Sequence, residues 1–162
     1  MRFLNSKLKI ENTILQNIAK KYGTPAYCYS YKQLRENIND FKKNFKSISP
    51  LICFAIKSNT NLNLIKEIKK FGLGADVVSM GELMLALKAG ISPKKIVFSG
   101  VGKTSKEINF AIDKNILLIN SESKNEIIEI DKIAKIKKKR VNIGTVTYTH
   151  LTLPTSDLVY IS

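Results

Sequence analysis

The chain has 162 residues, of which 44% are hydrophobic and 25% are charged, values typical of a soluble globular domain. No apolar run approaches the roughly 18 residues needed to span a bilayer, and residues 1–11 lack the apolar stretch of a secretory signal. The two cysteines, Cys28 and Cys53, are too few for a disulfide framework and lack metal-ligand spacing. We therefore expect a cytoplasmic protein with no metal site and no membrane partner.

The net charge of +14 raises the alternative of a surface that binds nucleic acid. Arg2, Arg35 and Arg140 are the only arginines among the 27 basic residues, although arginine is the residue suited to bidentate phosphate and base contacts. The lysines are spread along the predicted helices, apart from a run within residues 135–140. This distribution favours solvated helix faces over a nucleic-acid partner.

The first thirty residues predict a helix and a strand that precede the main part of the fold. Residues 11–22 have a helical pattern that Gly23 closes, and residues 25–29 form a short apolar run that predicts a separate strand. Residues 31–45 then predict a second helix with its apolar side chains on one face.

From residue 51 onward, short apolar runs alternate with helical patterns. The apolar runs cover residues 51–56, 75–79, 95–98 and 116–119, with a fifth beginning at 140–143. The intervening helical patterns cover residues 61–71, 81–89, 104–114 and 123–136. The predicted strands start about 20 to 24 residues apart, which is typical of consecutive βα units.

Residues that begin and end helices agree with these boundaries. Gly72, Gly74 and Gly90 stand where helices should end, and Thr104 and Ser123 are candidate N-caps with a glutamate three residues later. Apolar strands separated by helices predict an α/β fold, either a doubly wound sheet or a (β/α)8 barrel. The even spacing favours the barrel, of which the chain supplies about four to five βα units.

The last residues differ in composition from the rest of the chain. Residues 145–162 contain no lysine or arginine but hold the only histidine, His150, and five of the nine threonines. We expect this segment to lie outside the fold, either as sequence introduced by a frameshift or a vector, or as a natural linker. The predicted organisation is therefore residues 1–30 before the barrel, 31–144 as a partial barrel, and 145–162 as a tail.

Lys57 is the first candidate for chemistry, because it ends the first apolar run. In βα proteins the carboxyl ends of the strands build the site, and the amine of a lysine there can react with an aldehyde. The chain is rich in lysine, however, so position alone favours a surface lysine.

Four sequence motifs strengthen the case for Lys57. They read YGTPAYCY at residues 22–29, CFAIKSN at 53–59, GADVVSMGEL at 74–83 and IVFSGVGKT at 96–104. In wording, order and spacing, over roughly residues 15–144, they resemble the diaminopimelate decarboxylases. The resemblance implies the alanine-racemase type of barrel and pyridoxal phosphate as the cofactor, with Lys57 as the lysine that holds it.

The resemblance also implies a reaction and further site residues. The reaction is the decarboxylation of meso-diaminopimelate, an amino acid, to L-lysine by a full-length homodimer. Asp76 corresponds to an acidic residue near the cofactor lysine and is a second catalytic candidate, with a helix-cap or loop carboxylate as the alternative. Ser99 and Gly100, at the end of the third strand, are candidate cofactor-binding residues, with packing as the alternative. Cys53 is expected to be a buried, inert thiol.

Two further motif residues and several functional alternatives stay open. Ser79 and Glu82 match the third motif, but Glu82 is also suited to the N-terminus of a helix. The protein could instead be an ornithine, arginine or carboxynorspermidine decarboxylase of the same fold, or a non-catalytic cofactor-binding or basic interaction protein. We expect these 162 residues alone to be inactive and poorly folded, because half a barrel exposes sheet edges and core surface.

Overall fold

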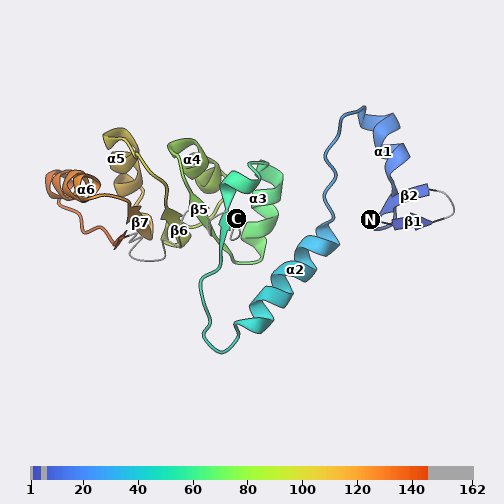
Figure 1. Ribbon diagram of the computed structural model, residues 1–162, viewed down its shortest axis with the longest axis horizontal. Helices are drawn as coiled ribbons and strands as arrows, with labels where there is room; N and C mark the ends of the chain where they lie inside the picture. Colours follow the sequence, from blue (N-terminus) through green and yellow to red (C-terminus); the bar gives the residue numbers. More distant parts are fainter. Residues whose placement is uncertain (1, 5–6, 146–162) are drawn as a thin grey trace, which may run out of the picture. The chain divides into compact units, whose positions relative to one another are not determined.

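The structure is a computed structural model that describes residues 2–4 and 7–145 (Figure 1). The chain divides into two compact units, Met1–Pro50 and Leu51–Ser162. No helix in the described ranges is long and apolar enough to cross a bilayer. The predicted tail, apart from Thr145, lies outside the described residues.

The N-terminal unit combines a small antiparallel sheet with two helices. Its elements are β1 (Arg2–Leu4), β2 (Lys7–Ile10), β3 (Thr13–Ile14), α1 (Leu15–Tyr22) and α2 (Tyr31–Asn44). The strands pair in the order β1-β2-β3. The prediction of α2 is confirmed, whereas these three strands were not predicted.

Two predictions for this unit are wrong. The helix predicted over residues 11–22 begins only at Leu15, because Glu11 adopts a positive φ of 53° and the chain turns back to pair Thr13 with Ile10. The strand predicted over residues 25–29 is absent, since no strand within the described residues pairs with this run.

Glu11 has a structural role at the start of α2. Its Oε1 accepts hydrogen bonds from the Ser30 hydroxyl, at 2.6 Å, and from the Lys32 backbone N–H, at 2.8 Å. These two bonds, the first more than the second, lower the pKa of Glu11 below its usual value. Ser30 itself caps α2 by accepting from the Gln33 N–H.

The second unit is the α/β fold that the alternating pattern predicted. Its strands are β4 (Cys53–Ala55), β5 (Gly74–Val77), β6 (Ile96–Phe98), β7 (Leu118–Ser121) and β8 (Ile143–Thr145). Its helices are α3 (Leu62–Lys70), α4 (Met80–Lys88), α5 (Ser105–Asp113) and α6 (Lys124–Lys137), with short 3₁₀ helices η1 (Ile56–Ser58) and η2 (Pro93–Lys95).

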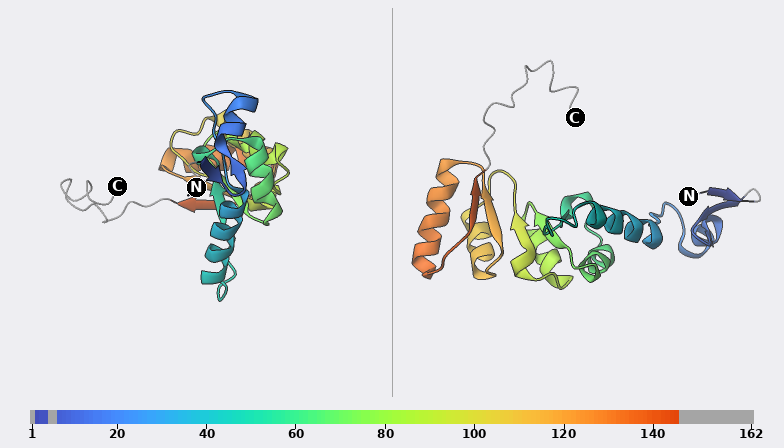
Figure 2. Two further views of the ribbon diagram at one scale, coloured as in Figure 1. Left: turned by 90° about the vertical axis from the view of Figure 1, so that its right-hand side faces the viewer. Right: turned by 90° about the horizontal axis from the view of Figure 1, so that it is seen from below.

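The strands form one parallel sheet in sequence order, β4-β5-β6-β7-β8, as consecutive βα units require. Consecutive helices from α3 to α6 contact one another along the row of strands (Figures 1 and 2). The four helices begin and end within one residue of the predicted patterns. The last two strands, in contrast, begin two and three residues later than predicted, so that β7 includes Asn120 and Ser121.

The helices bury one face of the three central strands, β5, β6 and β7. Ala75, Val77, Ile96, Phe98 and Ile119 are 0% exposed, and they form a single core cluster with apolar side chains of α4, α5 and α6. Residues that alternate with them along the strands point to the other face and are only partly buried (Asp76, Val97, Ser99, Leu118 and Asn120). The second face therefore keeps polar side chains accessible.

Glycines at two kinds of position shape the connections. Gly72 and Gly90 have positive φ angles of 78° and 87° after helices, as predicted. Gly74 does not end a helix, because it is the first residue of β5. A Cβ there would overlap the Lys95 carbonyl oxygen and lie 2.9 Å from the Cys53 sulfur, so close approach of neighbouring strands requires glycine.

Candidate active site at the carboxyl ends of the strands

The sequence-predicted site residues all lie at one edge of the sheet, where the parallel strands end. Lys57 is in η1 directly after β4, Asp76 is in β5, and Ser99 and Gly100 follow β6. Register supports the grouping, since Ala55 pairs with Asp76 and Asp76 pairs with Val97, two residues before Ser99.

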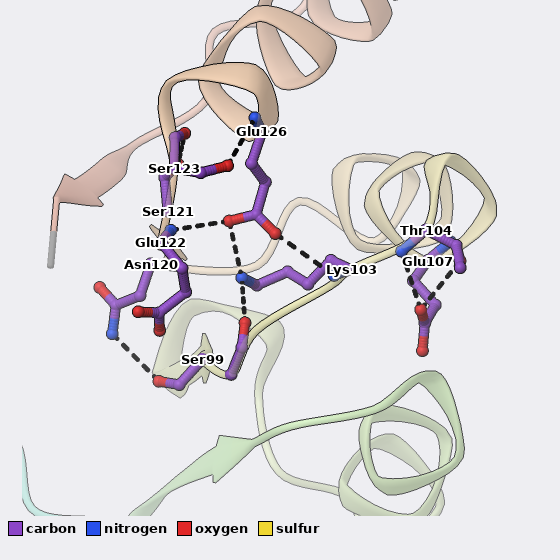
Figure 3. Close-up of polar contacts among 10 residues, drawn as sticks. Ser99, Lys103, Thr104, Glu107, Asn120, Ser121, Glu122, Ser123 and Glu126 are labelled. Atoms are coloured by element: carbon purple, nitrogen blue, oxygen red, sulfur yellow. Dashed lines mark hydrogen bonds and ion pairs between the residues drawn. The ribbon is translucent and has the colours of Figure 1, made fainter.

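Three polar side chains from neighbouring strands form a hydrogen-bonded chain across this edge. The Ser99 hydroxyl donates to Asp76 Oδ1 at 2.6 Å. The Asn120 side-chain N–H donates to the Ser99 oxygen at 3.0 Å (Figure 3). Each group is partly buried, and these two hydrogen bonds orient the three side chains relative to one another. The result is a carboxylate of defined orientation beside the lysine-bearing turn.

Asn120 is a site residue that the sequence reading missed. It faces the site only because β7 extends two residues further than its apolar run, and its register partner is Gly144 on β8. A Cβ at Gly144 would overlap the Asn120 side-chain oxygen, so the glycine leaves room for this amide. Ser99 directly follows the apolar run 95–98, and Asn120 directly follows the next run, 116–119. This shared position could have identified Asn120 from the sequence.

Lys57 presents its side chain to solvent at this edge. It is exposed, and its amine makes no hydrogen bond or ion pair with any described residue. The strand predicted over residues 51–56 is shorter than expected, and the chain turns at Ile56, whose side chain is fully buried. The buried isoleucine anchors the turn that carries Lys57.

Gly100 allows the chain to turn immediately after Ser99. It has a positive φ of 92°, and a Cβ there would lie 3.2 Å from the Val78 Cβ. The backbone conformation therefore favours glycine, and the Val78 side chain leaves little room for a Cβ. The Ser99 backbone N–H donates to the Val77 carbonyl, which continues the parallel ladder one residue past β6.

The motif residues Ser79 and Glu82 act as helix caps. The Ser79 side chain accepts from the Glu82 N–H at 3.2 Å, and the Glu82 carboxylate accepts from the Val78 N–H at 2.9 Å. These contacts confirm the interpretation of Glu82 as a residue that favours the helix N-terminus.

Cys53 is only partly buried, so the prediction of a buried thiol is wrong in degree. Burial raises its pKa, and the nearby negative charge of Asp76 raises the pKa further. A raised pKa leaves less of the nucleophilic thiolate, which agrees with the expectation of an inert thiol.

Glu122 follows β7 and contributes an unusual carboxylate. Its Oε2 is buried and has no hydrogen-bond partner within the described part of the chain. Burying a carboxylate oxygen without a donor is unfavourable, so this oxygen is open to a donor from a ligand or from residues outside that part.

Comparisons with known proteins agree on one family. A family model described as "Pyridoxal-dependent decarboxylase, pyridoxal binding domain" matches residues 31–155. The chain is 42% identical over 156 residues to a diaminopimelate decarboxylase of Aquifex aeolicus, covering 93% of this chain and 37% of that protein. It is 44% identical over 120 residues to the Helicobacter pylori enzyme, covering 74% and 30%.

Solved structures give the same result for the fold. Diaminopimelate decarboxylase from M. jannaschii superposes with a TM-score of 0.85 at 34% identity, over 89% of this chain and 35% of that one. The Helicobacter pylori enzyme complexed with L-lysine gives a TM-score of 0.78 at 39% identity, over 81% and 33%. The prediction of a partial barrel of this type is confirmed.

The matches also show how much of its relatives' length the chain covers. It spans about a third of the length of the curated relatives, 37% and 30% for the two described above. The family match starts at residue 31 and runs to residue 155, into the segment of altered composition. The division at residues 30 and 144, and the interpretation of the tail, stay predictions.

Proposed function

This chain belongs to the pyridoxal-dependent decarboxylases, and from that membership we propose that its protein converts meso-diaminopimelate to L-lysine with pyridoxal phosphate. Relatives at 39–44% identity are named diaminopimelate decarboxylases, and one of their structures holds L-lysine, the product of the proposed reaction. The structural observation that carries the proposal is the exposed amine of Lys57 at the carboxyl edge of the sheet.

The residues at this edge fit the cofactor. The Lys57 amine has no competing partner among the described residues, so it can bind the cofactor aldehyde. The face that the helices leave uncovered bears Asp76, Ser99 and Asn120, so polar groups line the space beside that amine. We infer that Lys57 holds pyridoxal phosphate and that Ser99 and Gly100 contact it.

The bound cofactor supplies an aldehyde for the amino acid and an electron-withdrawing ring that makes loss of CO2 possible. In this proposal Asp76 is a second catalytic residue, which orients the Lys57 amine through its negative charge. The hydrogen bond from Ser99 holds the Asp76 carboxylate in place for that role. Residues that select the substrate and hold its distal end are proposed to lie in the part of the relatives' length that this chain does not span.

The alternatives have less support. The arginine decarboxylase of the Paramecium bursaria Chlorella virus is only 24% identical and shows the fold alone. The basic run near the end of α6 is largely engaged within the protein. Lys137 pairs with Asp113 at 2.6 Å, and Lys139 donates to the Ile112 carbonyl. We therefore propose an amino-acid substrate and no nucleic-acid partner.

Location and assembly belong to the same proposal. Both cysteines are free thiols, which fits the reducing cytoplasm. The full-length protein is proposed to be a homodimer, as the family resemblance implies, and light scattering during size-exclusion chromatography measures this directly.

A trapping experiment tests the cofactor lysine. The intact protein is incubated with pyridoxal phosphate, reduced with borohydride and digested, and the modified peptide is identified by mass spectrometry. We expect the modification on Lys57 and its loss in Lys57→Ala. Lys66→Ala, which removes an exposed lysine of α3, is the matched control and should keep the modification. Modification elsewhere, with Lys57 unmodified, would contradict the proposal.

An activity assay tests the substrate. CO2 release and L-lysine formation are measured with meso-diaminopimelate, and ornithine and arginine serve as competing substrates. We expect turnover of meso-diaminopimelate only, and none in Lys57→Ala. A preference for ornithine or arginine would replace the substrate assignment while leaving the family intact. The isolated 162 residues are expected to show no turnover.

A further inference from the structure

A buried ion pair lies just beyond the polar chain of the candidate site. The Lys103 amine and Glu126 Oε2 are 3.1 Å apart, and their side chains are only 2% and 7% exposed (Figure 3). Five further ion pairs within residues 7–145 have both side chains at least 21% exposed. Because removing two charges from water is unfavourable, this pair needs a compensating arrangement.

Lys103 folds back onto the loop that follows β6. Its amine donates to the Gly100 carbonyl at 2.6 Å, and its backbone N–H donates to Glu126 Oε1 at 3.3 Å. Between these contacts the backbone turns at Gly100 and Gly102, whose φ angles are 92° and 70°. The lysine therefore closes a tight loop that starts directly after Ser99.

Glu126 secures the neighbouring loop, which follows β7. Its Oε2 accepts from the Glu122 backbone N–H at 2.8 Å, and its own N–H donates to the Ser123 side chain at 3.2 Å. One carboxylate thus holds the loop after β6 and the loop after β7 together. The hydrogen bond from Asn120 to Ser99 spans the same two strands (Figure 3).

We propose that Lys103 and Glu126 are positioning residues for the cofactor site. The pair fixes the Gly100 carbonyl and the Glu122 N–H, and so sets the separation of the two strand ends. That separation determines whether Asn120 reaches Ser99 and whether Ser99 holds Asp76. The inference rests on the proposed function, since it concerns how Asp76 and Ser99 are presented to a cofactor bound at Lys57.

Single and double substitutions of Lys103 and Glu126 can distinguish a role in positioning the cofactor site from a role in stability alone. Lys103→Met and Glu126→Leu are made singly and together in the intact protein, with Lys106→Met, an exposed lysine of α5, as the control. Three quantities are measured for each variant: the melting temperature, the Kd for pyridoxal phosphate, and the amide exchange of cofactor-free protein near Gly100 and Asn120.

Each single variant should melt lower, because it leaves one buried charge unpaired. The double variant should recover the wild-type melting temperature. Its amides near Gly100 should nevertheless exchange faster than in the wild type, and its Kd for pyridoxal phosphate should be about tenfold higher, as when a group that orients a ligand-binding residue is lost. Lys103→Arg keeps the positive charge, so its affinity for pyridoxal phosphate should lie between those of the wild type and Lys103→Met.

A double variant with wild-type Kd and wild-type exchange would overturn the inference, since the pair would then be structural only. If the wild-type protein takes no pyridoxal phosphate on Lys57, the proposed function fails and the inference fails with it. Binding at Lys57 with no response to the variants would overturn the inference alone.

Discussion

Two glutamates, Glu107 and Glu126, occupy the same position in successive βα units but lie in different surroundings. Each stands three residues after an N-cap, Thr104 or Ser123, whose side chain accepts its backbone N–H. Each also accepts a backbone N–H from the preceding βα unit. For Glu107 the donor is Met80, at 3.1 Å, and for Glu126 it is Lys103, at 3.3 Å.

The surroundings of the two carboxylates differ in burial and in charge. Glu107 is partly exposed and completes a capping box with Thr104, whereas Glu126 is 8% exposed and pairs with a buried ammonium. The local pattern of a hydroxyl residue followed by a glutamate therefore fixes the cap in both cases. A residue from the neighbouring unit decides whether the carboxylate also becomes part of a buried pair.

The largest loss of folding stability is expected from breaking the buried ion pair of Lys103 and Glu126. Replacing Lys103 with methionine leaves the Glu126 carboxylate buried and unpaired, which should lower the free energy of unfolding by about 3–5 kcal/mol. Urea denaturation followed by circular dichroism measures this change, provided that the wild-type protein unfolds in one cooperative transition.

The double variant Lys103→Met with Glu126→Leu is the control for that measurement. Replacing a buried pair by apolar side chains of similar volume is often neutral or stabilising, by roughly 1–4 kcal/mol. We expect the double variant to unfold close to the wild type. A loss equal to the sum of the two single variants would show that the charges do not interact.

A smaller effect is expected from the exposed cap. Thr104→Ala removes the oxygen that accepts the Glu107 N–H and should cost about 1 kcal/mol of stability. Ser123→Ala is the matched change at the other cap, where the side chain accepts the Glu126 N–H. It should cost a similar or smaller amount, because the Thr104 hydroxyl additionally donates to Glu107 Oε2. A much larger loss at Ser123 would mean that this cap also supports the buried pair.

The caps and the four helices of the second unit could be predicted from sequence because their determinants are local. Apolar side chains recur at helical spacing, and hydroxyl residues stand where the helices begin. Lys57 was predicted as the cofactor lysine through its motif, and it lies directly after β4, at the strand end that the prediction assumed.

Features that depend on contacts between distant residues could not be predicted. The strand ending in Asn120 and Ser121 was placed too early, because polar residues do not extend an apolar run. The apolar run at residues 25–29 predicted a strand, but no partner strand is present among the described residues. The sequence around Lys103 does not distinguish it from the other lysines, because its burial depends on tertiary contacts with Gly100 and Glu126.

Glu107, the more exposed of the two glutamates, should make the stability of the fold depend on pH. Hydrogen bonds, first from the Thr104 backbone N–H and also from that of Met80, lower the pKa of Glu107 below its ordinary value of 4.5. A carboxyl whose pKa is lower in the folded state stabilises the fold fully above pH 4.5 and progressively less as the pH falls through its folded pKa.

Glu107→Gln isolates this contribution, because it removes the charge and keeps the size of the side chain. The stability difference between wild type and Glu107→Gln should be constant near pH 7 and shrink as the pH falls below 4.5. Chemical denaturation at a series of pH values measures it. A difference that stays the same down to pH 3 would show that the charge of Glu107 is not what stabilises the cap.

The smallest loss of stability is expected at an ion pair whose two side chains are mostly exposed. Lys135 and Asp131 lie one helical turn apart on α6, 2.7 Å from each other, with side chains 76% and 56% exposed. Such pairs contribute about 0.3–0.5 kcal/mol, so Lys135→Gln should shift the unfolding midpoint very little, and less still at high salt. The distance is shorter than that between Lys103 and Glu126, yet the expected effect is far smaller. If both substitutions proved equally costly, distance rather than burial would control these interactions, and the contrast between the buried and exposed carboxylates would lose its physical basis.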